Sequence, residues 1–191
     1  MKQALLEAQK AGDRGEVPVG AVVVCKDRVI ARAHNLTETL TDVTAHAEMQ
    51  AITAAASTLG GKYLNECTLY VTVEPCVMCA GAIAWAQTGR LVFGAEDEKR
   101  GYQRYAPHAL HPKTVVVKGV LGDECAALMK NFFAGKRRES LISSNSTYSP
   151  SSCEKSFLRG LECGEVFSLC AASSWEEADC CLSLNEYPFP D

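Results

Sequence analysis

The first 139 residues alternate between helical patterns and short runs of β-favouring residues, and this alternation limits the fold. Near the start, Ala4, Leu5, Ala8 and Ala11 recur at helical spacing. Five strand-like runs and three further helical segments follow: strands at 19–25, 29–33, 67–73, 90–93 and 114–118, and helices at 44–57, from Pro75 onward and at 123–133. Helices interleaved with apolar strands imply an α/β protein, a three-layer α/β/α sandwich around a mixed sheet.

Local signals set the expected helix boundaries. Thr44 is a good N-cap for the second helix, and Pro75 is well placed to open the third. Acidic residues begin the helix at 123–133, and the basic run 136–138 comes just beyond its expected end. Both charges complement the helix dipole, so this segment is expected to close the folded part of the chain.

Composition changes after Glu139. Residues 1–139 hold 17 Lys and Arg against 15 Asp and Glu, whereas residues 140–191 hold 2 against 8. The segment 140–152 is mostly Ser with Asn and Thr, which is typical of a flexible linker, and 153–191 shows no sustained helical or strand period. We therefore expect one folded domain over 1–139, followed by a Ser- and Cys-rich acidic tail without ordered structure.

Several protein classes are excluded by composition. The longest apolar run, 19–25, is far shorter than the roughly 20 residues that a membrane-spanning helix needs. The N-terminus is amphipathic and lacks the apolar centre of a secretory signal, so we expect a cytoplasmic protein without a membrane partner. In that compartment, the ten cysteines favour metal binding or burial over disulfides. Neither part is basic enough for charge alone to indicate nucleic-acid binding.

Two short segments thirty residues apart carry side chains that zinc prefers. His46 and Glu48 form an H-x-E motif, and Pro75, Cys76 and Cys79 form P-C-x-x-C. Two cysteines on one helical turn can share an ion with a histidine. Three protein ligands leave a fourth position for water, which is the coordination count of a catalytic zinc site. We therefore expect one zinc ion per subunit, held by His46, Cys76 and Cys79.

Glu48 lies two residues beyond the candidate histidine ligand. If it points at the open position, it can take a proton from zinc-bound water and deliver it to the substrate. The two motifs in this order are the pattern of the zinc-dependent nucleobase deaminases. Each motif alone has another explanation. C-x-x-C could be a redox pair, and the histidine could be a hydrogen-bonded core residue.

Further segments carry a resemblance to a known family. They are 15–22 (GEVPVGAV), His34-Asn35, 68–72 (TLYVT), 78–82 (MCAGA), 92–95 (VFGA), and 123–128 (DECAAL) followed by Phe132-Phe133. Over about residues 1–138 the chain thereby resembles the bacterial tRNA-specific adenosine deaminases, within the zinc-dependent cytidine and deoxycytidylate deaminase superfamily. The C-terminal segment, 123–128 with Phe132-Phe133, distinguishes the families better than the zinc motif does, because the free-base cytosine deaminases have a different sequence there.

The resemblance implies a cytidine deaminase-like fold and a hydrolytic reaction on RNA. The wobble adenosine of an arginine tRNA, position 34, would become inosine. Zinc-bound hydroxide would attack C6 of adenine, and Glu48 would move protons to the ring and to the amine, which departs as ammonia. Members of the family are homodimers that contact the anticodon loop with both subunits, so a homodimer is expected here.

The resemblance also implies roles for five residues. Asn35 would hydrogen-bond the flipped adenine, and Val19 would pack on the base. Asp97 would contact the sugar, and Phe132 and Phe133 would lie beside the anticodon loop. From local pattern alone, Asn35 is a turn residue, Val19 is strand core and Asp97 is an exposed turn acid. We also expect at least one of the two phenylalanines to belong to the core.

Basic side chains are candidates for contacts with RNA phosphates. The resemblance implies such contacts for Lys136, Arg137 and Arg138. Glu96 stands where many relatives carry Arg, which replaces attraction to phosphate by repulsion. We hypothesise that nearby basic residues supply the contacts instead, namely Arg100, Arg104, His108 and His111.

Two other functions stay open at this point. A zinc deaminase of free guanine, cytosine or a nucleoside would share every zinc ligand and differ only in its pocket and RNA surface. A non-catalytic zinc-binding or RNA-binding module is the third hypothesis. Glu48 argues against the last one, because a structural zinc site does not require a carboxylate at its open side.

Overall fold

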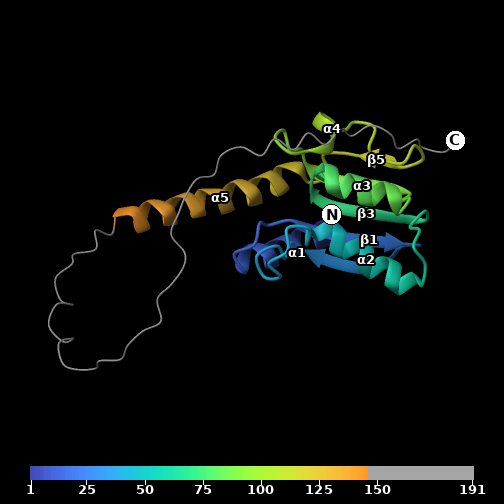
Figure 1. Ribbon diagram of the computed structural model, residues 1–191, viewed down its shortest axis with the longest axis horizontal. Helices are drawn as coiled ribbons and strands as arrows, with labels where there is room; N and C mark the ends of the chain where they lie inside the picture. The colour runs from blue at the N-terminus through green and yellow to red at the C-terminus, as the bar shows by residue number, and fades with distance from the viewer. Residues whose placement is uncertain (146–191) are drawn as a thin grey trace, which may run out of the picture. The chain divides into compact units, whose positions relative to one another are not determined.

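The computed structural model describes residues 1–145, and its elements follow the predicted α/β alternation (Figure 1). In chain order the elements are α1 (Lys2–Asp13), β1 (Gly20–Cys25), β2 (Arg28–His34), α2 (Ala47–Leu59), β3 (Cys67–Val73), α3 (Val77–Trp85), β4 (Arg90–Ala95), α4 (Tyr102–Tyr105), β5 (Val115–Val117) and α5 (Gly122–Asn145). All five predicted strands are present, and the short helix α4 was not predicted.

The five strands form one mixed sheet in the order β2-β1-β3-β4-β5. β1 is antiparallel to both β2 and β3, whereas β3, β4 and β5 are parallel. The register pairs Gly20 with His34, and Val73 with Ala95. The start of β1 and the ends of β2, β3 and β4 therefore lie at the same edge of the sheet. We call it the β3 C-terminal edge.

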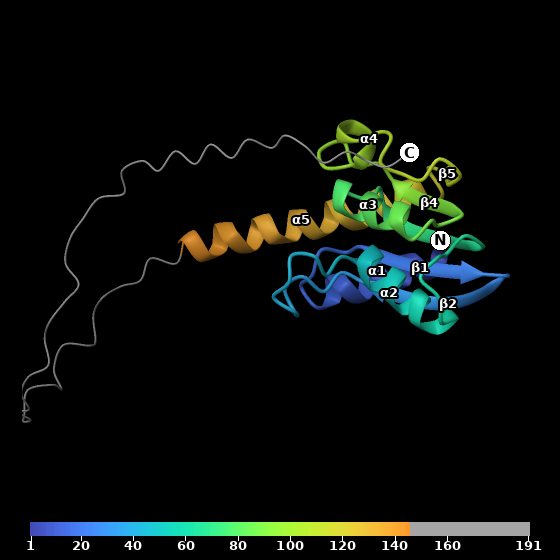
Figure 2. The same ribbon diagram turned by 45° about the vertical axis from the view of Figure 1, so that its right-hand side comes forward.

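Helices cover both faces of this sheet, which confirms the predicted three-layer sandwich (Figures 1 and 2). α1 and α5 contact one another and pack on one face, while α2 and α3 contact one another and pack on the other. Two glycines allow the layer formed by α1 and α5 to pack closely on the sheet. A Cβ at Gly20 would come within 2.1 Å of the Ala4 carbonyl oxygen, and one at Gly94 within 2.4 Å of Cys125 Sγ.

The main core cluster lies between the sheet and the α2–α3 layer. The strands contribute large apolar side chains such as Leu69 and Phe93, both fully buried. α2 contributes only alanines to the cluster, Ala47, Ala51 and Ala55. Small side chains let α2 approach the sheet closely, which holds the start of this helix in a fixed place beside β1 and β2.

Two predicted helix starts are wrong by a few residues. α2 begins at Ala47 with His46 as N-cap, because Thr44 instead closes a turn: its N–H and its hydroxyl both donate to Asp42 Oδ1 at 2.8 Å. Likewise α3 begins at Val77 with Cys76 as N-cap, so Pro75 precedes the helix rather than opening it. In both cases a candidate metal ligand occupies the N-cap.

α5 is longer than predicted. It continues past residue 133 to Asn145, so the basic run 136–138 lies inside the helix and not beyond its end. The prediction of a flexible linker is therefore wrong for residues 140–145, which continue the helix from good helix-forming residues such as Lys136 and Arg137. The predictions for 146–191 lie outside the described residues. Among the helices in residues 1–145, none is both long and apolar enough to cross a membrane.

The close packing of α1 on β1 yields a stability prediction. We expect Gly20→Ala to lower the free energy of unfolding by about 1–3 kcal/mol, because the added methyl group meets backbone atoms of α1. Urea denaturation of the parent and the variant measures the difference. Gly61→Ala is the matched control, since a Cβ at Gly61 meets no atom within 4 Å. Equal losses in both variants would contradict the packing argument.

Candidate active site

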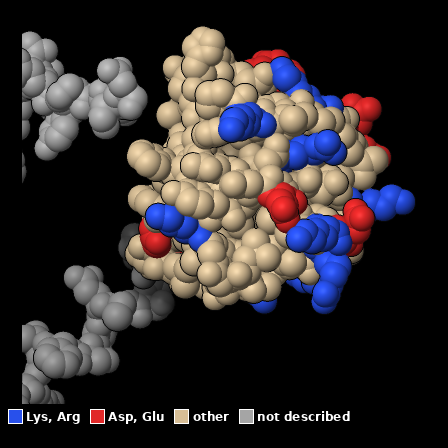
Figure 3. Space-filling model, turned by 90° about the vertical axis from the view of Figure 1, so that its right-hand side faces the viewer, with Lys and Arg blue, Asp and Glu red and all other residues tan. Residues whose placement is uncertain are grey.

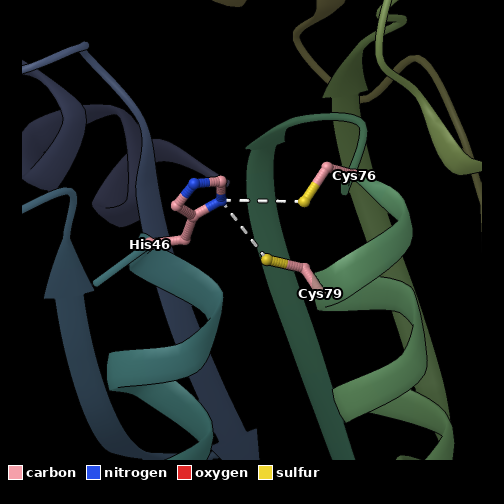
Figure 4. Close-up of side chains that lie close together, drawn as sticks. All are labelled: His46, Cys76 and Cys79. Carbon is pink, nitrogen blue, oxygen red and sulfur yellow. Dashed lines mark hydrogen bonds between the residues drawn. The ribbon is translucent and has the colours of Figure 1, made fainter. Parts of the chain in front are cut away.

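The N-termini of α2 and α3 bring three candidate metal ligands together. His46 is the N-cap of α2, Cys76 is the N-cap of α3, and Cys79 lies in the first turn of α3. His46 Nδ1 lies 3.7 Å from Cys76 Sγ and 3.5 Å from Cys79 Sγ (Figure 4). Figure 4 shows the histidine and the two thiols pointing toward one another from the two helices.

These distances fit a tetrahedral zinc ion. With Zn–S about 2.3 Å and Zn–N about 2.0 Å, a tetrahedron places the nitrogen about 3.5 Å from each sulfur. The observed 3.5 and 3.7 Å match that edge length. Within residues 1–145, His46, Cys76 and Cys79 form the only cluster of three or more His, Cys, Asp or Glu side chains close enough to hold a metal. Their donor set and geometry are therefore suited to zinc.

The electrostatics of the two thiols also favour a metal. The hydrogen bond from Cys79, with a further contribution from His46, lowers the pKa of Cys76 to about 4. The same pairing with Cys76, together with burial, raises the pKa of Cys79. The first thiolate therefore forms readily, and a cation between the two sulfurs would stabilise the second.

Glu48 lies in the first turn of α2, and its side chain is almost fully buried. Burial raises the pKa of Glu48 to about 7. The carboxyl group interacts with the Cys79 thiol, which places it beside the metal ligands rather than at the surface. A carboxyl group in this position is suited to exchange protons with a molecule bound at the cluster.

Val19 and Asn35 lie next to this cluster. The Asn35 N–H donates to the Val19 carbonyl oxygen at 3.0 Å, and the following residue, Leu36, donates its N–H to the Ala45 carbonyl oxygen at 3.0 Å. Because Ala45 directly precedes His46, the backbone holds both candidates beside the metal ligands. Val19 is half-buried against the core, and the Asn35 side chain is buried.

Asp97 reaches the same edge from the loop after β4. Its N–H donates to Glu74 Oε2 at 3.1 Å, while its own Oδ1 accepts hydrogen bonds from the N–H groups of Lys99 and Arg100 at 2.9 and 3.0 Å. Glu74 Oε1 also accepts the Gln103 N–H at 3.0 Å. Asp97 is therefore a turn residue of a loop fastened to the segment before Cys76.

The two phenylalanines lie elsewhere. α5 packs on β3, β4 and α1, on the opposite face from α2 and α3, so Phe132 and Phe133 are not brought to the metal cluster. Their rings meet edge to face at 5.3 Å; Phe133 is 42% exposed and Phe132 is half-buried. The expectation that one of them belongs to the core is wrong, because only the first turns of α5 pack closely on the sheet at Cys125.

The basic candidates differ in their surroundings. Arg100 is exposed, and its charge opposes the rise in the pKa of His46 that the hydrogen bond with Cys76 causes. Arg104 is engaged within its own loop: its guanidinium donates to the Glu98 carbonyl oxygen at 2.7 Å and lies 5.5 Å from the Tyr105 ring. On α5, Lys136 Nζ lies 5.7 Å from the Phe132 ring.

Two glutamates were missed at the sequence level. Glu16 is fully buried near Asn35, and Glu74 fastens the loop that carries Asp97. Glu16 lies within the segment 15–22 and Glu74 directly precedes Pro75, but their partners lie 19 to 29 residues further along the chain. No local pattern predicts such contacts.

The comparison with protein families agrees with the chemistry of the cluster. Deaminases of nucleobases bind zinc through histidine and cysteine and use a glutamate that is not a ligand. The family model of MafB19-like deaminases matches residues 1–137 of the chain. The chain therefore belongs to this family of deaminases, which are enzymes.

Three relatives narrow the comparison. The tRNA-specific adenosine deaminase of Bacillus subtilis is 45% identical over 144 residues, which cover 73% of this chain and 89% of the relative. A solved structure from work on A-to-I editing by tRNA:A34 deaminases is 46% identical with a TM-score of 0.63, covering 67% of this chain and 96% of that one. The guanine deaminase from Nitrosomonas europaea is 25% identical with a TM-score of 0.62, covering 70% and 82%.

The cluster geometry predicts the metal content of the protein. We expect about one divalent metal ion per chain, and Cys79→Ser should reduce this to a small fraction because one ligand of three is lost. Elemental analysis of the purified protein measures the stoichiometry. Cys25→Ser is the matched control, since Cys25 is also a free thiol but lies outside the cluster. Full metal content in Cys79→Ser would contradict the assignment.

Proposed function

We propose that this chain hydrolyses adenosine to inosine at the wobble position of a tRNA, with zinc as its metal. The observation that carries the proposal is the metal cluster with its buried glutamate, in a chain 45% identical to a tRNA-specific adenosine deaminase. Anticodon-loop bases suit this chemistry, because an unpaired base enters a pocket more easily than a paired one.

The residues at the β3 C-terminal edge would have two roles in the reaction, metal binding and proton transfer. His46, Cys76 and Cys79 would hold zinc. Zinc would lower the pKa of a water molecule, so that the water is more easily deprotonated and attacks the base. Glu48 would take one proton from the attacking water and pass it to the ring, and would then move the second proton of that water to the amino group, which leaves as ammonia. Burial of Glu48 keeps bulk water from competing for these protons.

Three further side chains are proposed to bind the nucleotide. Asn35 hydrogen-bonds the base and Val19 packs against it, since both lie beside the metal ligands. Asp97 contacts the sugar from the loop that Glu74 fastens. Phe132 and Phe133 would contact the anticodon loop only through the surface of α5.

We propose Arg100 as the main phosphate contact among the basic residues near the site. It is exposed and close to His46, whereas Arg104 is held by Glu98 and Tyr105. The basic run 136–138 on α5 is a second candidate, further from the cluster. At the opposite end of the sheet, where β1 ends, basic and acidic side chains are mixed on the surface (Figure 3). In that region Lys26 Nζ pairs with Glu66 Oε2 at 3.0 Å.

A cytoplasmic homodimer that acts on an arginine tRNA completes the proposal. α3 exposes three apolar side chains, Val77 at 43%, Met78 at 37% and Trp85 at 83%. Exposed apolar surface of this kind is typical of a protein interface, and a second copy of the chain is the proposed partner. Sedimentation of the purified protein tests the dimer.

The assay that tests the function compares RNA with free bases. Purified protein is incubated with an arginine tRNA that carries adenosine at the wobble position and, separately, with adenosine, guanine and cytosine. Inosine at that single RNA position supports the proposal. Ammonia from guanine without any reaction on RNA would favour the alternative, a free-base deaminase like the one from Nitrosomonas europaea.

Glu48→Ala should separate metal binding from chemistry. The variant should keep its metal, because Glu48 is not one of the three ligands, and should lose turnover by about 10²–10⁴-fold, because proton transfer is removed. Metal analysis and inosine formation on the same preparation check both expectations. Undiminished deamination would exclude Glu48 as the acid and base.

Arg100→Ala should weaken tRNA binding and reduce its dependence on salt. Loss of one phosphate contact lowers the slope of log affinity against log salt concentration by about 1. Affinity measured over a salt series gives this slope. Arg104→Ala is the matched control, since its guanidinium is held within its own loop. Equal slopes for the parent and Arg100→Ala would rule out this contact.

A further inference from the structure

Glu16 is a fully buried carboxylate that the proposed chemistry does not use. It lies between α1 and β1 and accepts hydrogen bonds from four groups of the segment after β2. Its Oε2 accepts from Asn35 Nδ2 at 3.1 Å, Thr37 Oγ1 at 3.3 Å and the Glu38 N–H at 3.2 Å, and its Oε1 accepts from the Thr39 N–H at 2.7 Å.

These donors keep Glu16 ionised. Burial alone would raise the pKa of Glu16, but the hydrogen bonds from Thr39, Glu38 and Thr37 outweigh it and leave the pKa below its usual value. An ionised carboxylate only accepts hydrogen bonds. The amide group of Asn35 must therefore turn its nitrogen, and not its oxygen, toward Glu16.

The second amide hydrogen of Asn35 is also used within the protein. Asn35 Nδ2 lies 2.9 Å from Thr37 Oγ1, and the Thr37 hydroxyl gives its own hydrogen to Glu16. Thr37 therefore has only lone pairs to offer Asn35, which fixes the direction of this hydrogen bond. Both hydrogens of the Asn35 amide are committed to the protein.

The amide oxygen is left for another partner. In the part of the chain that the structure describes, Asn35 Oδ1 accepts no hydrogen bond. Among those same residues, Thr88 Oγ1 is the only fully buried polar side-chain atom without a partner, so Asn35 Oδ1 keeps contact with solvent. The oxygen is thus free to accept a hydrogen bond from a bound molecule.

We propose that Glu16 and Thr37 are positioning residues that fix Asn35 as a hydrogen-bond acceptor toward the base. This inference rests on the proposed function. An acceptor in this place selects a base with a donor group, such as the 6-amino group of adenine. It disfavours a carbonyl oxygen at the same position, as in the product inosine. The two-point pairing of an asparagine with adenine, which needs an amide donor as well, does not fit the observed contacts.

Exchanging donor and acceptor tests the proposal. Glu16→Gln places an amide donor among groups that are themselves donors, so kcat/KM on the wobble-adenosine tRNA should fall about 10–100-fold. The double variant Glu16→Gln/Asn35→Asp restores a donor–acceptor pair with the same net charge and still presents an oxygen to the base. Its kcat/KM should be about tenfold higher than that of Glu16→Gln alone.

Controls separate this effect from general damage. Glu7→Gln removes another buried carboxylate, which contacts Lys10 and His34 instead of Asn35, and should leave kcat/KM unchanged. Metal content and the urea midpoint are measured for every variant. A kcat/KM within twofold of the parent in Glu16→Gln would overturn the positioning role. No recovery in the double variant would overturn the acceptor assignment.

A measurement without substrate distinguishes failure of this inference from failure of the proposed function. In the parent, the side-chain amide hydrogens of Asn35 should exchange slowly with water in NMR spectra, because both are hydrogen-bonded. In Glu16→Gln they should exchange faster. Slow exchange in a protein that forms no inosine would reject the function alone, whereas fast exchange in the parent would reject the inference whatever the substrate.

Discussion

β1 runs antiparallel to both of its neighbours, and the candidate site depends on that arrangement of backbone hydrogen bonds. It brings the start of β1 to the edge where β2 and β3 end, so that Val19 and Asn35 are hydrogen-bonded and Glu74 lies at the same edge of the sheet. The helices that follow these strands begin at the same edge. Their N-termini supply the metal ligands, and their dipoles favour thiolate there.

Buried glutamates at this edge have opposite surroundings. Glu16 is surrounded by hydrogen-bond donors, and Glu74 accepts two backbone N–H groups, so both hold loops in place. Glu48 is buried beside the Cys79 thiol, and burial raises its pKa to about 7. A carboxylate stabilised by several donors is a structural anchor, whereas one whose pKa is raised by burial is ready to take up and release a proton near neutral pH.

Local sequence signals predicted what depends on local structure. The strand 67–73 was predicted correctly in position, and the three predicted ligands lie close together, because apolar runs and ligand spacing are properties of a few neighbouring residues. The end of α5 was missed, since the helix continues through Gly135, a residue type that often ends helices. The anchors of the two loops were missed because their contacts form only when distant strands pair. The start of α2 was predicted wrongly for a local reason, because the N–H and the hydroxyl of Thr44 both donate to Asp42.

The loop that carries Asp97 passes directly over Glu74. A Cβ at Gly101 would lie 2.4 Å from the Glu74 Cδ atom, and the Tyr102 N–H donates to the Pro75 carbonyl oxygen at 2.9 Å. For protein engineering, this divides the loop into fixed and variable positions. Gly101 and Glu74 set its distance from the metal ligands, so a side chain at 101 would displace the loop without touching substrate. Exposed neighbours such as Glu96 can vary in charge and size at little cost to the fold.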